Sequence, residues 1–327
     1  MIIDLPNYDG ARDTQTPEQK DKNYSFAEVC TAPFPVTWHE KSQDEWRYFP
    51  IRNQDGSGQC VCMTYATELG IIFNEKYGKF VDFSSVYPYQ QRKYPTVSGC
   101  TSEDIYEVFP KLGNIFEKDM PSQNMNDSQS MLVPKEKWFD DMARTWNIKR
   151  IALPLDFETI ASTIQATGKG VMVWFRFHPS EWTDIPVVSN NIPTSGHSVT
   201  VVDFILKGGK KYLVIQDSWG ITYAMQGLRL ISEEYFNERC FQAAYLMNFV
   251  TQNNDTIAIK PVFDGSIMSA QKCFKYEGFF PSNINEVESW GNITRSACIK
   301  FQQRYNIEPA LGNFGPLTKA KLYELYK

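Results

Sequence analysis

The spacing of apolar side chains changes near residue 170, and this change limits the folds that the chain can adopt. Before residue 170 the spacing is that of helices. Two helices are predicted over 102–112 and 156–167, the second with Asp156 as its N-cap. A longer helix is predicted to follow Cys60 and to end near Tyr77-Gly78. Its apolar face consists of Cys62, Ala66, Leu69 and Phe73.

After residue 170 the spacing becomes that of strands. One strand is predicted from the alternation of Val171, Val173, Phe175 and Phe177 with their neighbours. Further short strands are predicted over 198–204, 212–216 and 228–231, and Gly208-Gly209 between two of them favours a hairpin turn. Helices followed by antiparallel strands predict an α+β domain with two lobes.

The length of 327 residues fits about two domains, since a domain usually holds ~100–200 residues. The polar residues 1–33 are interpreted as an N-terminal arm, and residues 34–250 as the main domain. A polar stretch predicts a linker over 251–262. Residues 263–327 predict a small helical domain, with a turn at 312–316 before its last helix. One of its helix faces is marked by Ala297, Phe301 and Tyr305.

Composition excludes several classes of protein. The 33 Lys and Arg residues against 38 Asp and Glu give a net charge of −5, so no basic surface for nucleic acid is expected. No apolar run approaches the ~18 residues of a membrane-spanning helix. The N-terminus lacks the basic and apolar regions of a secretory signal, so synthesis in the cytoplasm is expected. Seven cysteines without a Cys-x-x-Cys pair fit neither a disulfide scaffold nor a zinc ribbon.

The most informative segment for chemistry is the loop over 54–59 and the cysteine that follows it. Cys60 is predicted in the first turn of a helix, where unpaired N–H groups and the helix dipole stabilise a thiolate. The side-chain amide of Gln54 can fold back over this thiol. Together with the Cys60 backbone N–H it would supply two donors to a developing oxyanion.

Two further motifs lie downstream. Gly196-His197-Ser198 begins a predicted strand, and Gln216-Asp217-Ser218-Trp219-Gly220 ends another. A thiol, an imidazole and a carboxylate form the set of nucleophile, general base and orienting group. The sequence therefore predicts Cys60, His197 and Asp217 as a catalytic set, with Gln54 as oxyanion donor.

These motifs, in this order, resemble those of the papain-like cysteine peptidases. In that family the first block reads Asn-Gln-Gly-x-Cys-Gly-Ser-Cys-Trp, and the later one reads Asn-Ser-Trp-Gly. Phe34-Pro-Val-Thr-Trp38 is similar to the start of the family's mature chain, and the 137 positions from Cys60 to His197 match the expected ~130–150. The resemblance covers about 34–250 and implies the two-lobed papain-like fold, no cofactor or metal, and a peptide or protein substrate. It also implies that Trp219 shields the contact between His197 and Asp217.

The chain departs from the family pattern at three positions. Val61 replaces the Trp after the nucleophile, Ser57 replaces a disulfide cysteine, and Asp217 replaces the usual Asn. A carboxylate still accepts from the imidazole N–H, and its charge favours the imidazolium and the thiolate. Cys62 is predicted to have a packing role, and His39 and His178 are predicted at the surface.

The C-terminal segment has a resemblance of its own. Ile293 to Tyr305, followed by Gly312-Asn-Phe-Gly-Pro-Leu-Thr, is similar to small three-helix peptidoglycan-binding domains. The match covers about 263–327 and implies peptidoglycan as a partner and a bacterial or phage source. A protein without a secretory signal would reach a cell wall after lysis or inside a virion. The other interpretation is a helical appendage that has kept the fold and lost the ligand.

Two other functions use the same residues. A transglutaminase-like acyl transferase shares the Cys, His and Asp, although its Cys and His usually lie closer in sequence. A peptidase fold that has lost catalysis could serve the C-terminal segment as a scaffold. The arm is far shorter than the family's inhibitory pro-segments, so no large block is expected from residues 1–33. The arm could still lie across the site as a strap.

Overall fold

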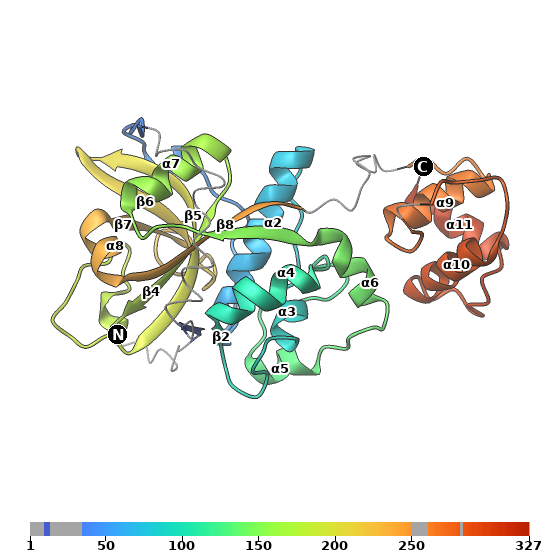
Figure 1. Ribbon diagram of the computed structural model, residues 1–327, viewed down its shortest axis with the longest axis horizontal. Helices are drawn as coiled ribbons and strands as arrows, with labels where there is room; N and C mark the ends of the chain where they lie inside the picture. The colour runs from blue at the N-terminus through green and yellow to red at the C-terminus, as the bar shows by residue number, and fades with distance from the viewer. Residues whose placement is uncertain (1–9, 14–34, 250–260, 282–283, 327) are drawn as a thin grey trace. The chain divides into compact units, whose positions relative to one another are not determined.

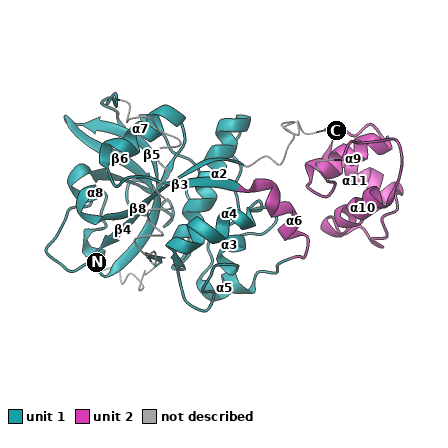
Figure 2. Ribbon diagram, viewed as in Figure 1, with its two compact units in different colours: residues 1–135, 148–249 teal, residues 136–147, 250–327 magenta. Residues whose placement is uncertain are grey.

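The computed structural model describes residues 10–13, 35–249, 261–281 and 284–326. It divides into two compact units, residues 1–135 with 148–249 and residues 136–147 with 250–327 (Figure 2). From the sequence, residues 136–147 were predicted to lie in the main domain. These residues group with the C-terminal segment because Trp138 packs edge-to-face on Phe279, with ring centroids 5.4 Å apart.

The first unit is built on a six-stranded antiparallel sheet with the strand order β3-β8-β4-β5-β6-β7 (Figure 1). The strands are β3 Ile148–Ala152, β4 Val171–Phe177, β5 Ser195–Lys207, β6 Lys210–Gln216, β7 Leu228–Ser232 and β8 Cys240–Phe249. The four predicted strands are confirmed, and the hairpin between β5 and β6 turns at Gly208 and Gly209, whose φ angles are 59° and 73°. β3 and β8 were not predicted.

The long helix α2, Cys60–Tyr77, packs against β5 and β8 and has the bounds that the sequence predicts. Its N-terminal part is anchored on the sheet, where the Thr64 hydroxyl donates a hydrogen bond of 3.0 Å to the carbonyl of Ser198 in β5. It ends at Gly78, whose φ of 67° is the left-handed conformation that glycine adopts without strain. The hydrogen bond between Thr64 and Ser198 fixes the position of Cys60 relative to β5.

The other helices surround the sheet and α2. α7, Phe157–Thr167, confirms the predicted helix, and Asp156 caps it by accepting from the Thr159 N–H at 2.7 Å. The predicted helix over 102–112 is a π-helical turn, Asp104–Val108, continued by α4, Phe109–Leu112. Further α-helices among the described residues before 250 are α3 Val86–Gln90, α5 Asp127–Leu132, α6 Phe139–Ala143 and α8 Glu233–Arg239.

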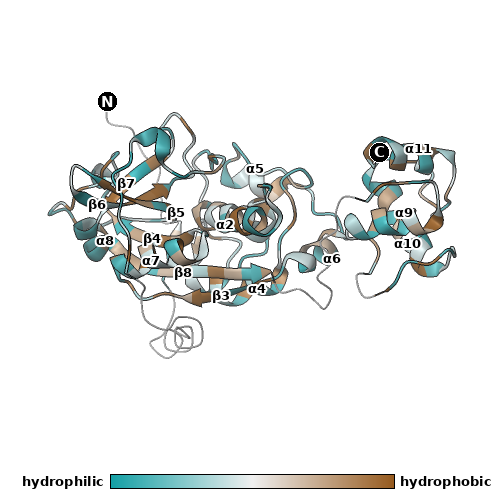
Figure 3. Ribbon diagram, turned by 90° about the horizontal axis from the view of Figure 1, so that it is seen from above, coloured by the Kyte–Doolittle hydropathy of each residue, from teal (hydrophilic) through white to brown (hydrophobic). Residues whose placement is uncertain are grey.

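Two apolar cores lie on the sheet. One contains side chains of β4 and β5 packed against α7 and α8, with Phe157, Phe175 and Phe236 fully buried. The other contains Trp46, Ile71 and Leu230. The apolar segments of the strands and of α2 are brown in Figure 3. The helices and the sheet together confirm the predicted α+β class.

The C-terminal part of the second unit contains α9 Ile267–Tyr276, α10 Asn292–Arg304 and α11 Pro316–Leu325. Its core includes Phe274, Phe301 and Leu322, each fully buried. Gln302 is also buried, and its amide donates to the Thr318 hydroxyl at 2.8 Å. No helix in the described parts of either unit is long and apolar enough to cross a membrane.

Candidate active site

Cys60 is the first residue of α2. Backbone contacts with distant segments hold the loop that precedes it. The Gln54 N–H donates to the carbonyl of Ser218 at 2.8 Å. A Cβ atom at Gly58 would lie 2.4 Å from the backbone nitrogen of Gly99, so only glycine fits there. The thiol therefore stands at the N-terminus of a long buried helix, where the helix dipole favours a negative charge.

His197 and Asp217 come from neighbouring strands. His197 lies in β5 opposite Phe175 of β4, and Asp217 directly follows β6. Their side chains meet with 2.8 Å between His197 Nε2 and Asp217 Oδ1. Both are buried, with 0% and 2% of their surface exposed. The structure thus brings together the imidazole and the carboxylate that the sequence predicts as a pair.

The other imidazole nitrogen, His197 Nδ1, is buried and has no hydrogen-bond partner of standard length and angle among the described residues. The Cys60 thiol interacts with this imidazole. Burial opposes the charged ring, but Asp217 and Cys60 outweigh burial and raise the pKa of His197 above its usual value. Burial would raise the pKa of Asp217, but His197 and Arg229 lower it well below its usual range. The site therefore favours an imidazolium beside an ionised carboxylate.

Gln54 lies in the same group of residues. Its Oε1 accepts a hydrogen bond of 2.6 Å from the Ser218 hydroxyl, next to Asp217 in sequence. Its Nε2 donates to the carbonyl of Ser57 at 2.6 Å, and the amide has a second N–H that this bond does not use. Gln54 is 1% exposed, so its position is fixed by these partners.

Two tryptophans pack against the imidazole. Trp219, predicted from the sequence, lies 5.2 Å from His197 between ring centroids. Trp182, which sequence reasoning missed, lies edge-on at 5.6 Å and donates from Nε1 to Asp217 Oδ2 at 3.0 Å. Trp182 belongs to a connecting loop without a recognisable motif. Only its isolation as a large apolar residue among polar ones could have drawn attention to it.

The described part of the arm runs directly over the thiol. β1, Ala11–Arg12, pairs in parallel with β2, Cys100–Thr101. The Gly10 N–H donates to the Gly196 carbonyl at 3.2 Å, and the Gly10 carbonyl accepts from the Cys100 N–H at 2.9 Å. A Cβ atom at Gly10 would lie 2.6 Å from Cys60 Sγ. Residues 10–13 thus form a strap across the Cys60 thiol, while the rest of the arm lies outside the described residues.

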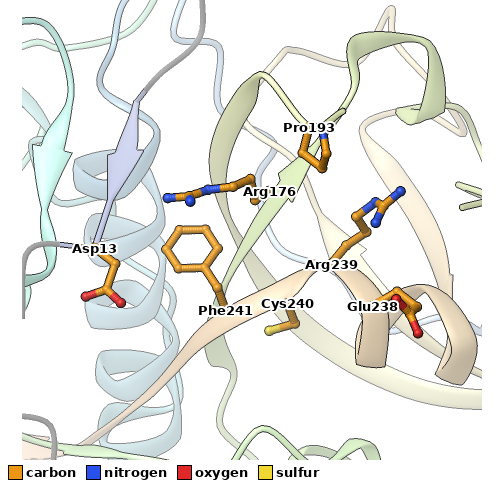
Figure 4. A pocket seen from close by; sticks show the side chains of 7 residues that line it. All are labelled: Asp13, Arg176, Pro193, Glu238, Arg239, Cys240 and Phe241. Atoms are coloured by element: carbon orange, nitrogen blue, oxygen red, sulfur yellow. The ribbon is translucent and has the colours of Figure 1, made fainter. Parts of the chain in front are cut away.

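A pocket of about 360 Å³ adjoins this strap (Figure 4). Asp13 lines one side of it, and the Arg176 guanidinium lies over the Phe241 ring, 5.1 Å from its centroid. Arg176 pairs in register with Gly196, the residue whose carbonyl binds the strap. The remaining lining residues are Pro193, Glu238, Arg239 and Cys240.

The other candidate groups lie apart from the imidazole–carboxylate pair. Cys62 contacts Cys100, with 3.5 Å between the sulfur atoms, and burial raises the pKa of both thiols. His39 is exposed and His178 is half-buried, so the surface prediction holds fully only for His39. Across the described ranges, no group of three or more His, Cys, Asp or Glu side chains could hold a metal ion.

No protein-family model matches the chain, and no curated protein matches it in sequence. Among solved structures, xylellain, a cysteine protease from Xylella fastidiosa, matches with a TM-score of 0.60 and 15% identity. That match covers 75% of this chain and 97% of xylellain. The Amb a 11 cysteine protease of ragweed pollen, in its proform, matches with a TM-score of 0.48 and 18% identity, over 69% of each chain. The first of these matches shows that the chain has the fold of papain-like cysteine proteases.

Proposed function

We propose that the first unit is a cysteine endopeptidase in which Cys60 is the nucleophile. The observation that carries this proposal is the hydrogen bond of 2.8 Å between His197 Nε2 and Asp217, which leaves Nδ1 for the thiol at the start of α2. This is the geometry that a nucleophile, a general base and an orienting group require.

The reaction begins with attack of the Cys60 sulfur on the carbonyl carbon of a peptide. The carbonyl oxygen becomes an oxyanion, which accepts hydrogen bonds from the backbone N–H of Cys60 and from the second N–H of Gln54 Nε2. The N–H of the first helical residue has no partner within its helix and is therefore available. These two donors stabilise charge that is present only in the transition state and the intermediate.

The imidazolium of His197 then protonates the leaving amine, and the C–N bond breaks to give a thioester. The now neutral imidazole removes a proton from water, and the hydroxide attacks the thioester carbon. The C–S bond then breaks, which releases the acid product and restores the Cys60 thiolate beside the His197 imidazolium. Asp217 holds the ring in one orientation through Nε2 and stabilises its charged form. Trp182 and Trp219 cover the ring, so water has little access to the contact between His197 and Asp217.

Replacement of the nucleophile tests the proposal. Cys60→Ala is expected to lower hydrolysis of a peptide library by more than ~10³-fold, whereas Cys62→Ala, two residues further along the same helix, should retain it. Epoxide or chloromethyl-ketone reagents should label Cys60 far faster than Cys62. Equal labelling of the two thiols, or activity that survives Cys60→Ala, would refute the proposal.

The same assay separates the two other functions. Incorporation of an amine into a glutamine peptide without net hydrolysis would indicate a transglutaminase-like acyl transferase. If freshly reduced protein cleaves no member of the library, the fold serves as a scaffold.

We also propose that residues 263–327 bind bacterial cell wall and thereby raise the concentration of substrate near the peptidase. The resemblance of this segment to peptidoglycan-binding domains supports the proposal. A further support is an aromatic pair in which the half-buried Phe314 stacks on Trp290 at 4.7 Å, a surface suited to sugar rings. Full-length protein should sediment with insoluble peptidoglycan, and protein ending at residue 250 should not. If both sediment equally, this targeting proposal fails while the peptidase proposal stands.

A further inference from the structure

Arg229 completes the surroundings of Asp217. The Asp217 Oδ1 atom accepts from His197 Nε2 at 2.8 Å and from the Ser218 N–H at 2.7 Å. Its Oδ2 atom accepts from Trp182 Nε1 at 3.0 Å and from Arg229 Nε at 2.9 Å. Both oxygens are therefore fully bound, and one of the four donors carries a permanent positive charge.

The guanidinium of Arg229 cannot turn away from this carboxylate. It is 3% exposed, and its NH1 group donates to the carbonyls of Trp182 at 3.0 Å and Thr183 at 2.8 Å. It also lies 5.3 Å from the ring centroids of both Trp182 and Trp219. Arg229 therefore links the carboxylate to the two tryptophans that cover His197.

The register of the sheet produces this contact. Arg229 in β7 pairs with Ile215 in β6, and Asp217 lies two positions after Ile215, directly after the end of β6. The Asp217 N–H donates to the carbonyl of Gly227 at 2.8 Å. A shift of β7 by one residue would point the arginine to the opposite face of the sheet.

The charges of the site balance only when Arg229 is counted. The charged and titratable groups that face His197 are Cys60 at the start of α2 and Asp217 after β6, and Arg229 on β7 faces Asp217. With a thiolate and an imidazolium, the carboxylate would leave one buried negative charge unbalanced. The guanidinium cancels that charge, and a buried charge without a partner is costly.

We propose that Arg229 is a positioning residue that makes Asp217 equivalent, in net charge, to a neutral hydrogen-bond acceptor for His197. This proposal rests on the proposed peptidase function. Asp217 and Arg229 then act jointly. Removing either one alone leaves the charge of the other uncompensated beside His197, whereas replacing both with neutral residues leaves the charge balance of the site unchanged.

The test compares Arg229→Met, Asp217→Asn and the double variant in the full chain. The sequence has three histidines, so the titration of His197 can be followed separately by NMR. Arg229→Met should shift this titration to higher pH by at least ~1 unit, since an uncompensated carboxylate stabilises the imidazolium. Asp217→Asn alone should shift it to lower pH, because the guanidinium then faces the ring without its partner.

The double variant carries the decisive result. In the double variant, iodoacetamide should alkylate Cys60 at least ~10-fold faster than in Asp217→Asn alone, as expected for coupled residues. Arg229→Lys keeps the charge and should keep the titration of His197 near that of the native protein. As a control, Arg52→Met removes an arginine that is 2% exposed and pairs with Asp82 at 3.0 Å, and it should not move the titration.

Two outcomes would overturn the proposal. One is a His197 titration that Arg229→Met leaves unchanged. The other is a double variant whose alkylation rate is the product of the two single effects. Alkylation and NMR need no peptide substrate. A protein that cleaves no peptide but shows the expected shifts would therefore refute the peptidase function and leave the role of Arg229 standing.

Discussion

Replacement of Gly10 by alanine tests whether the strap controls access to Cys60. The added methyl carbon would lie 2.6 Å from Cys60 Sγ, whereas non-bonded heavy atoms attract one another best at ~3.5–4.0 Å. The sulfur has little room to move, because it must stay near His197. We therefore expect Gly10→Ala to displace residues 10–13 from the thiol.

The size of the effect follows from the contacts that would be lost. The Gly10 backbone makes two hydrogen bonds, with Gly196 and Cys100. At a net ~1 kcal/mol for each bond, the loss is ~2 kcal/mol, which increases the open population by ~30-fold if the strap is mostly closed. The second-order rate constant for alkylation of Cys60 by iodoacetamide, and the initial rate of peptide hydrolysis, should rise by up to this factor.

A matched control is available for this experiment. Gly291 has a φ of −85° and open space around the position of a Cβ atom, so Gly291→Ala should leave both rates unchanged. Deletion of residues 1–33 should raise both rates in the same direction as Gly10→Ala. A many-fold rise would contradict the expectation from sequence that the arm forms no large block, and would agree with the strap that the sequence analysis left open. Rates that stay constant or fall in Gly10→Ala would refute the reasoning.

Three further predictions concern the residues around the site. Trp182→Phe keeps an aromatic ring but loses the indole N–H that donates to Asp217. We therefore expect a loss of ~1.5–3 kcal/mol in the free energy of unfolding by urea, and a lower kcat. The pKa of His197 is raised in the folded protein, so the ring stabilises the fold fully below its unfolded pKa of about 6.5, and this stabilisation is lost as pH rises through the folded pKa. The free energy of unfolding, measured from pH 6 to 10, should fall accordingly. The His197→Gln variant should lack this fall. Asp156→Ala removes the N-cap of α7 and should cost ~1 kcal/mol, measured by urea unfolding, without changing the rate of Cys60 alkylation.

The sequence predicted the parts of the site that local patterns define. Cys60 follows a turn-rich loop, and His197 and Asp217 lie at strand ends, so their surroundings in sequence already indicate their positions. Trp182 and Arg229 were not assigned a role because their contacts with Asp217 depend on the fold of a loop and on the register of β7. Neither property leaves a pattern along the chain.

In the six-stranded sheet two strands were missed, β3 and β8. Like the contacts of Trp182 and Arg229, they depend on packing and pairing between segments that are distant in sequence. β8 is buried along most of its length, and the helices α2 and α8 pack against it. A strand that is covered on both faces does not need to alternate apolar and polar residues, so it lacks the period that identifies a strand. β3 has only five residues and depends on its pairing with β8.

Asp217 stands where papain-like peptidases usually have a neutral Asn, and its charge was predicted to favour the imidazolium and the thiolate. Its surroundings show how the fold accommodates it. Arg229, held by hydrogen bonds to two backbone carbonyls, places a positive charge beside this carboxylate. In the role that we propose for Arg229, the carboxylate keeps the geometry of a strong acceptor for His197, while the net charge of the site equals that of a site with a neutral acceptor. In this arrangement the pH range of the site depends on the pair Asp217–Arg229 as a unit rather than on the carboxylate.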